Sequence, residues 1–182
     1  AIRERGRSLE EEWANRMERE AVERLRVSRN EDEERRRLAE ETGIRSTELL
    51  ERMRELDLDA GSANLLFLVP VVGMAGADGT VSYAERAIVK EIARKGGIAP
   101  GSWAYAMLDG WTHDPPAGET LDRMLALVRD VLATLPEHEA NEIRRRVHAA
   151  LERVGRASGG LFGIGALSQS ERRFMERMVS AG

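Results

Sequence analysis

Residues 65–86 read LLFLVPVVGMAGADGTVSYAER, and this stretch decides how the rest of the chain folds. Its first part, residues 65–77, contains no charged side chain, as expected for a helix that its neighbours surround. These 13 residues are too few for a membrane-spanning helix, which needs about 20. Pro70 predicts a kink or a late helix start, because proline has no backbone N–H. We therefore expect a buried central helix.

The second part of the stretch, residues 79–86, predicts the start of another helix. Ser82 and Glu85 have the spacing of a capping box, in which each side chain accepts a hydrogen bond from the other residue's backbone amide. Val81 stands where an apolar residue anchors the first turn. The same pattern, Gly-x-apolar-Ser-x-x-Glu-Arg, recurs at residues 165–172. We expect both helices to begin in the same way.

Asp78 needs a separate explanation, because Ile164 holds the corresponding position in the second copy. In an EF-hand register Asp78 and Glu85 occupy positions five and twelve, but Met74 and Gly76 at positions one and three exclude a complete loop. Two interpretations stay open at this stage. Asp78 and Glu85 are oxygen donors for a hard divalent cation such as Ca²⁺, or the segment is a turn followed by a capped helix.

Composition narrows the classes of function. Of the 182 residues, 42% are hydrophobic and 4% aromatic, which suits a helical core. The chain has no cysteine, which removes disulfides, thiolate catalysis and cysteine-type zinc sites. A net charge of −4 gives no global electrostatic argument for nucleic acid. No secretory signal is visible, and we expect a cytoplasmic protein without membrane insertion.

Helical spacing of apolar residues continues beyond residue 82, and no strand pattern competes with it. We expect a loop at residues 110–118, GWTHDPPAG, because two consecutive prolines prevent the regular backbone hydrogen bonding of a helix or a strand. The predicted fold class is all-α, a compact multi-helix bundle. The expected helices cover residues 83–95, a short segment after Ser102, residues 121–132, a segment that starts at Pro136, and residues 169–179.

Residues 1–57 predict a charged N-terminal helical extension, followed by a helical domain over residues 58–182. The extension holds 14 Arg and 17 Asp or Glu, so its charges nearly cancel. Asn30 looks like the cap of a second helix that Gly43 closes, and Ser46 like the cap of a third. The first helix carries an apolar residue at every fourth position, namely Leu9, Trp13, Met17, Ala21 and Leu25.

The charged helices allow two interpretations. They form solvated faces with ion pairs between successive turns, or they form a coiled-coil or docking arm for a protein partner. Self-association of the chain also stays open.

Residues 75–85, AGADGTVSYAE, resemble the signature of TerB-like (tellurite-resistance) domains, in which an apolar helix ends in Ala-Asp-Gly and Ser-x-x-Glu opens the next helix. The resemblance covers about residues 63–179 and includes GGLFGIGALSQSE at residues 159–171. It implies a compact all-helical fold, a link to stress response and tellurite resistance, and acidic residues that bind a divalent metal. Asp78 and Glu85 match those acidic positions.

Other candidate chemistry is sparse. His138 and His148 lie ten residues apart on one predicted helix, too far for a shared metal without a third element. A third interpretation is a helical hydrolase that uses His113 and Asp114 in the predicted loop. We expect a non-enzymatic TerB-like module that acts in stress response or protein–protein interaction. The alternative is a metal-independent scaffold or adaptor whose N-terminal helices dock a partner.

Overall fold

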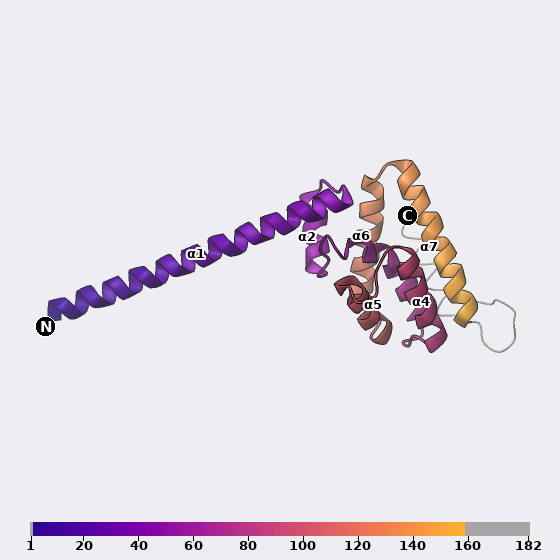
Figure 1. Cartoon of the computed structure of the whole chain (residues 1–182), viewed down its shortest axis with the longest axis horizontal. Helices are drawn as coiled ribbons and strands as arrows, with labels where there is room; N and C mark the ends of the chain where they lie inside the picture. The colour runs from indigo at the N-terminus through magenta and orange to yellow at the C-terminus, as the bar shows by residue number, and fades with distance from the viewer. Residues whose placement is uncertain (1, 159–182) are drawn as a thin grey trace.

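The computed structural model describes residues 2–158, with side chains for residues 16, 17 and 19–157. This part of the chain contains seven α-helices and one 3₁₀ helix and no strand, which confirms the all-α prediction (Figure 1). In chain order the helices are α1 (Ile2–Thr42), α2 (Thr47–Glu55), η1 (Ala63–Leu68), α3 (Val69–Ala75), α4 (Tyr83–Lys95), α5 (Trp103–His113), α6 (Gly118–Thr134) and α7 (Glu137–Ser158).

The short helix α3 lies at the centre of the bundle, as the apolar stretch predicts. All seven of its residues are buried. It contacts α4, α6, α7 and η1, so neighbours surround it. Pro70 stands in its first turn, directly after η1 ends at Leu68, which confirms the late helix start. None of the described helices is both long enough and apolar enough to cross a membrane.

The helices around α3 bury the faces that their spacing predicts. On α6 the buried residues are Leu121, Met124, Leu125, Leu127, Val128, Val131 and Leu132. On α7 the buried apolar residues are Ala140, Ala150, Leu151 and Val154. Pro136 precedes α7 as predicted. The predicted second capping box at Ser168 and Glu171, and the predicted helix over residues 169–179, lie outside the described residues.

The predicted loop at residues 110–118 is wrong in its first half. Helix α5 continues through His113, and only residues 114–117 separate it from α6. The prolines act on the residue that precedes them, so Pro115 ends α5 at Asp114 without disturbing the turn before it. Gly110 is tolerated inside α5, because glycine weakens a helix without breaking it.

The predicted helix start at Asn30 is also wrong, because α1 runs without interruption to Thr42. A cap residue stabilises the first turn of a helix but does not create an end where the preceding residues are already helical. Gly43 closes α1 as predicted, with φ +70° and its amide donating to Ala39 O over 2.9 Å. Ser46 caps α2, where it accepts from the Leu49 amide over 3.4 Å.

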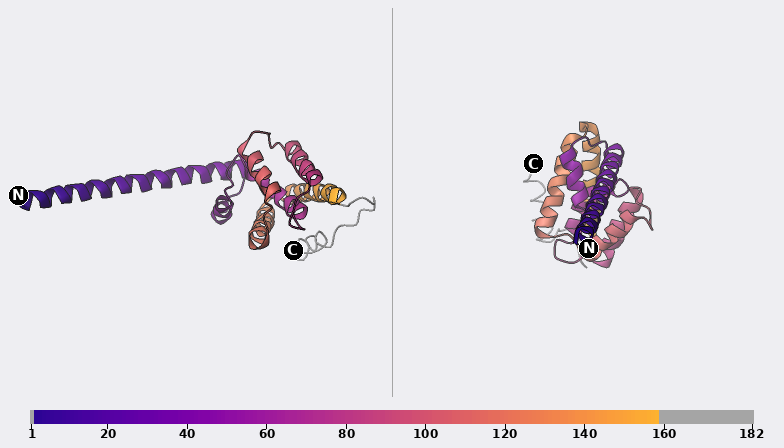
Figure 2. Two further views of the ribbon diagram at one scale, coloured as in Figure 1. Left: turned by 90° about the horizontal axis from the view of Figure 1, so that it is seen from below. Right: turned by 90° about the vertical axis from the view of Figure 1, so that its left-hand side faces the viewer.

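Helix α1 is attached to the body only at its C-terminal end. Leu38 and Ile44 belong to the same hydrophobic core as α3, together with Leu49, Leu50 and Met53 of α2. Toward the N-terminus α1 runs away from the other helices as a nearly straight rod (Figure 1), and the left view of Figure 2 agrees. We call residues 2–29 the projecting segment. The core therefore includes residues on both sides of position 57, while the projecting segment lies outside it.

Gly76 marks a close approach between the end of α3 and the loop before α6. A Cβ atom at this position would lie 2.5 Å from Pro115 Cβ and 2.7 Å from Pro115 Cγ. We expect Gly76→Ala to lower the free energy of unfolding by about 1–3 kcal/mol, the usual cost of overpacking. Gly110→Ala is the matched control. Nothing would lie within 4 Å of its Cβ, so it should stabilise the protein by up to about 1 kcal/mol. Denaturant titration measures both, and equal effects would contradict the close approach.

Candidate functional site

The Asp-Gly segment forms a tight turn between α3 and α4. Gly79 has φ +95°, a conformation that glycine adopts without strain. Its amide donates to Gly76 O over 2.9 Å. The Thr80 amide donates to Asp78 Oδ1 over 3.0 Å, so the aspartate accepts from the backbone two residues ahead. This bond gives Asp78 a structural role in the turn.

The capping box at the start of α4 is present as predicted. The Glu85 amide donates to Ser82 Oγ over 3.3 Å, and the Ser82 amide donates to Glu85 Oε2 over 2.8 Å. Val81 is buried in the core, where it anchors the first turn. Glu85 is only 6% exposed. A carboxylate buried to this extent needs hydrogen-bond donors, and the Ser82 amide is one of them.

The two residues predicted to hold a cation lie in different surroundings. Asp78 is exposed on the turn and Glu85 is buried beneath the first turn of α4. Each accepts a hydrogen bond from a nearby backbone amide. Within the described residues, no group of three or more His, Asp or Glu side chains is placed to hold a metal ion. The turn-and-cap interpretation accounts for both carboxylates, and cation binding by them stays a prediction.

A polar cluster joins α4 to the end of α5. Arg86 Nη1 lies 2.9 Å from His113 Nε2, and Arg86 Nη2 donates to Thr112 O over 3.2 Å. Because Arg86 can only donate, Nε2 accepts, and the His113 proton resides on Nδ1. Nδ1 lies 2.8 Å from Asp109 O and donates to it. Both ring nitrogens of His113 therefore have structural partners at the C-terminus of α5.

Lys90 and Asp109 add an ion pair to this cluster, one turn after Arg86 on α4 and one turn before His113 on α5. The hydrogen bond from Lys90 lowers the pKa of Asp109, with smaller contributions from the charges of Lys90 and Arg86. Lys90 Nζ also lies 5.9 Å from the centre of the Tyr105 ring, within cation–π range. The cluster orients α5 against α4, so a catalytic pair of His113 with Asp114 is not what this geometry favours.

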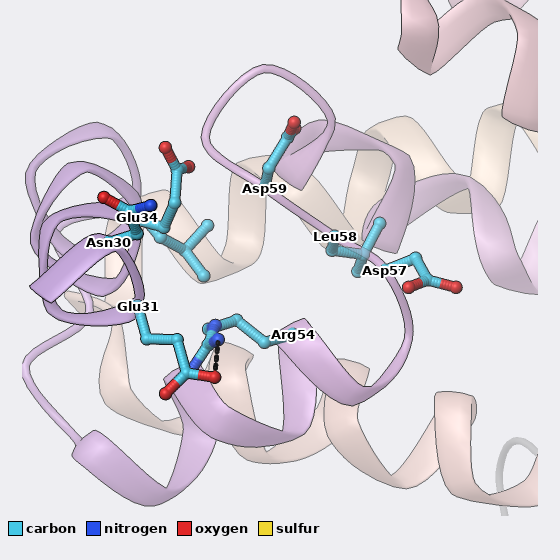
Figure 3. A pocket seen from close by; sticks show the side chains of 8 residues that line it. Asn30, Glu31, Glu34, Arg54, Asp57, Leu58 and Asp59 are labelled. Carbon is cyan, nitrogen blue, oxygen red and sulfur yellow. Dashed lines mark ion pairs between the residues drawn. The ribbon is translucent and has the colours of Figure 1, made fainter. Parts of the chain in front are cut away.

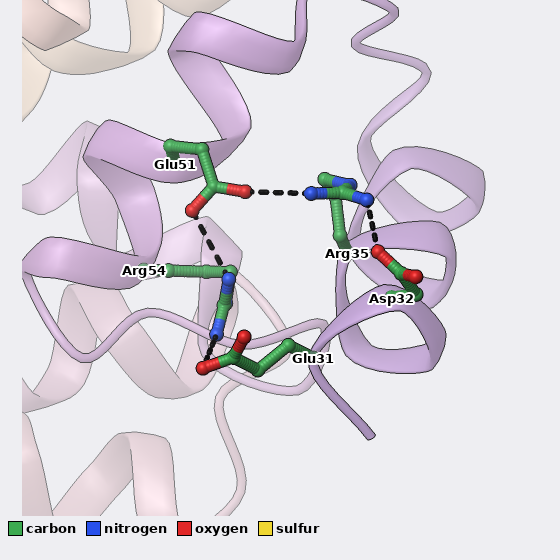
Figure 4. Close-up of polar contacts among 5 residues, drawn as sticks. All are labelled: Glu31, Asp32, Arg35, Glu51 and Arg54. Atoms are coloured by element: carbon green, nitrogen blue, oxygen red, sulfur yellow. Dashed lines mark hydrogen bonds and ion pairs between the residues drawn. The ribbon is translucent and has the colours of Figure 1, made fainter. Parts of the chain in front are cut away.

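A network of charged side chains fixes the base of α1 to α2 (Figure 4). Arg35 binds Glu51 through Nη1 over 2.9 Å and Asp32 through Nη2. Arg54 binds the other oxygen of Glu51 over 3.0 Å and lies 3.7 Å from Glu31. The hydrogen bond from Arg35 lowers the pKa of Glu51, and the same bond raises the pKa of Arg35. Each guanidinium thus links two carboxylates.

Beside this network an open cavity of 290 Å³ separates α1 from the loop that follows α2 (Figure 3). Four carboxylates and one guanidinium line it, together with Asn30, Leu38 and Leu58. The charged residues are Glu31, Glu34, Asp57, Asp59 and Arg54. Sequence reasoning did not find this cavity, because it depends on how α2 folds back against α1. The only available signal was the run of four acids at residues 31–34.

The projecting segment carries most of the large apolar side chains that the described residues expose. Met17 is 39% exposed, Val22 58%, Leu25 72% and Val27 47%. Elsewhere in the described part of the chain, Tyr83 and Trp103 are the large hydrophobic residues with this degree of exposure. Of these four residues, Met17 and Leu25 belong to the predicted stripe, whereas Val22 and Val27 lie on other sides of the helix. Met17 and Leu25 are therefore available to a partner.

The cation hypothesis predicts a measurable stabilisation. Ca²⁺ at about one hundred times its Kd should add about 2.7 kcal/mol, which raises the melting midpoint by about 5–10 °C at this size. Asp78→Asn should abolish the shift, whereas Asp114→Asn, an exposed acid in another loop, should not. If no ion among Ca²⁺, Mg²⁺, Mn²⁺ and Zn²⁺ moves the wild-type midpoint, the segment is a turn and a helix cap only.

The lowered pKa of Glu51 predicts a pH-dependent attachment of α1. A carboxylate with a lowered folded-state pKa stabilises the fold above its ordinary pKa of about 4.3, and this contribution is lost as the pH falls through the lowered value. The melting midpoint of Glu51→Gln should therefore lie below that of the wild type at pH 7, and the difference should shrink as the pH falls below about 4.3.

Glu55→Gln is the control for this comparison, since Glu55 is an exposed carboxylate on the same helix. A midpoint difference for Glu51→Gln that stays constant from pH 7 into the acid range would show that the ion pairs of Glu51 do not contribute to stability.

Comparison with known proteins returns no relative: no family model matches the chain, and no curated protein or solved structure matches it either. The resemblance to TerB-like domains therefore rests on the residues that carry it, above all residues 75–85, and membership of that family stays a prediction.

Proposed function

We propose that this chain is a non-enzymatic helical interaction module, in which a compact body holds out the projecting segment of α1 to dock a protein partner. The observation that carries the proposal is the exposure of Met17 and Leu25, two residues of the apolar stripe, on a helix that leaves the body. A metal-independent adaptor of this kind is the interpretation that the hydrogen bonds of Asp78 and Glu85 favour.

The physical chemistry of an isolated helix supports a partner. A helix gains most of its stability from packing an apolar face, and helices without such packing are marginal in water. Between residues 16 and 34, every described side chain is exposed except Ala21, which is half-buried. A partner that covers the apolar stripe would supply the packing that the body does not provide.

The base of α1 supports the same conclusion. Leu38 and Ile44 are buried in the core, and Arg35 and Arg54 bind carboxylates of both α1 and α2. These contacts hold the helix axis in one direction. A docking helix with a fixed direction loses less conformational entropy on binding than a disordered tail does.

Site-specific photocrosslinking in living cells tests the proposal. The full chain carries a photoactivatable amino acid at position 25, or, as the control, at position 145 on the exposed face of α7. We expect a defined adduct from position 25, identified by mass spectrometry, and none from position 145. Equal, diffuse labelling from both positions would show that the segment is only a solvated helix.

A further inference from the structure

We infer that the partner of the projecting segment is a second copy of this chain, bound antiparallel to the first around a two-fold axis at Met17. The inference rests on the proposed function, because it names the partner of the same surface. Two identical helices can bury one stripe against itself only if that stripe is self-complementary, as in any isologous interface.

The apolar stripe meets this requirement. Leu9, Trp13, Met17, Ala21 and Leu25 are symmetric about Met17, so reversing the helix superimposes the stripe on itself. In that register position 9 is level with position 25 of the other copy, and position 13 with position 21. The largest residue of the stripe is thus level with the smallest, a combination that favours a close approach of two helices. Met17 of one copy is level with Met17 of the other.

The order of charges along α1 selects the antiparallel direction. Three arginines lie within residues 3–7, three glutamates occupy residues 10–12, three arginines lie within residues 24–29, and four acids occupy residues 31–34. If two copies of α1 were parallel and in register, each block of charge would lie level with the identical block of the other copy, and like charges would repel. The antiparallel register keeps only two like pairs level, Arg5 with Arg29 and Glu11 with Glu23. It brings three opposite pairs level, Glu10 with Arg24, Arg3 with Glu31, and Arg16 with Glu18. Complementary charges of this kind fix orientation more than they raise affinity.

The acidic cavity lies at the level where the basic N-terminus would arrive. Glu31 and Glu34 of α1 line it, with Asp57 and Asp59 from the loop after α2 (Figure 3). Two of these carboxylates have a cation within the chain, since Arg54 lies 3.7 Å from Glu31 and Arg37 binds Glu34 over 3.3 Å. The arginines of residues 3–7 would complement Asp57 and Asp59, and the two-fold axis repeats the arrangement at the other end. The contact is closest at Met17, because a four-residue spacing winds about 40° per step around the helix.

Sedimentation equilibrium on the full chain tests the inference. We expect a concentration-dependent dimer for the wild type. Met17→Glu should raise its dissociation constant by more than about tenfold, since it places two like charges at the axis. Val22→Glu is the matched control: Val22 is also exposed, but it points about 140° away from Met17 around the helix, and it should change the constant by less than about threefold. Circular dichroism checks that both variants keep their helix content.

Cysteine crosslinking distinguishes the antiparallel arrangement from a parallel one, since the chain has no native cysteine. In the proposed register, position 14 of one copy lies one residue from the level of position 21 of the other. A mixture of Ala14→Cys and Ala21→Cys chains should oxidise to the mixed disulfide, and each variant alone should crosslink much less. Efficient crosslinking of Ala21→Cys with itself would overturn the antiparallel register.

Failure of the inference can be separated from failure of the proposed function. A chain that remains monomeric in sedimentation, and yet gives a photo-adduct with a different protein from position 25, overturns the second copy as partner and leaves the docking role intact. A photo-adduct between two copies of this chain, lost in Met17→Glu and retained in Val22→Glu, supports both.

Discussion

The structure depends on the burial of α3. A seven-residue helix in which every residue is buried cannot face water on any side, so the remaining helices must enclose it. Helices α4, α6 and α7 do so with the apolar faces that their spacing provides. The close approach of Gly76 to Pro115 shows how tightly the chain is packed where α3 ends. The Asp-Gly turn and the capping box then start α4 in the direction that this enclosure requires.

The same constraint explains why the residues that look most like a metal site have structural partners. The chain must reverse between α3 and α4 within a few residues, and the left-handed conformation of Gly79 makes that reversal possible. Asp78 and Glu85 accept hydrogen bonds from backbone amides at the turn and at the helix start, which would otherwise lack partners. A motif that serves this purpose fixes local geometry whether or not it also binds an ion.

Sequence reasoning predicted the elements whose signals are local. The bounds of α4, the caps at Ser46 and Ser82, and the buried face of α6 all follow from spacing and capping within single segments. It failed where two local signals competed. The glycine and prolines near residue 113 predicted a loop that begins too early, and Asn30 predicted a helix start inside a continuous helix.

The features of the candidate site that sequence could not provide are those that depend on distant contacts. Arg35 and Glu51 are 16 residues apart and meet only because α2 folds back against α1. The acidic cavity has the same origin, since its walls come from α1 and from the loop after α2. Exposure of the α1 stripe also required the structure, because an apolar spacing of four residues is equally compatible with a helix packed on the body.

The ion pairs at the base of α1 use arginine rather than lysine, and this choice has a physical reason. The first 89 residues contain no lysine, and every cation of the α1–α2 network is an arginine. Arg35 binds Asp32 and Glu51 with different nitrogens, and Arg54 does the same with Glu51 and Glu31. A planar guanidinium can link two carboxylates in a fixed geometry, whereas an ammonium acts as a point charge on a flexible stem. The network therefore fixes the direction of α1 as well as its attachment, and the proposed pairing of two copies through α1 requires such a fixed direction.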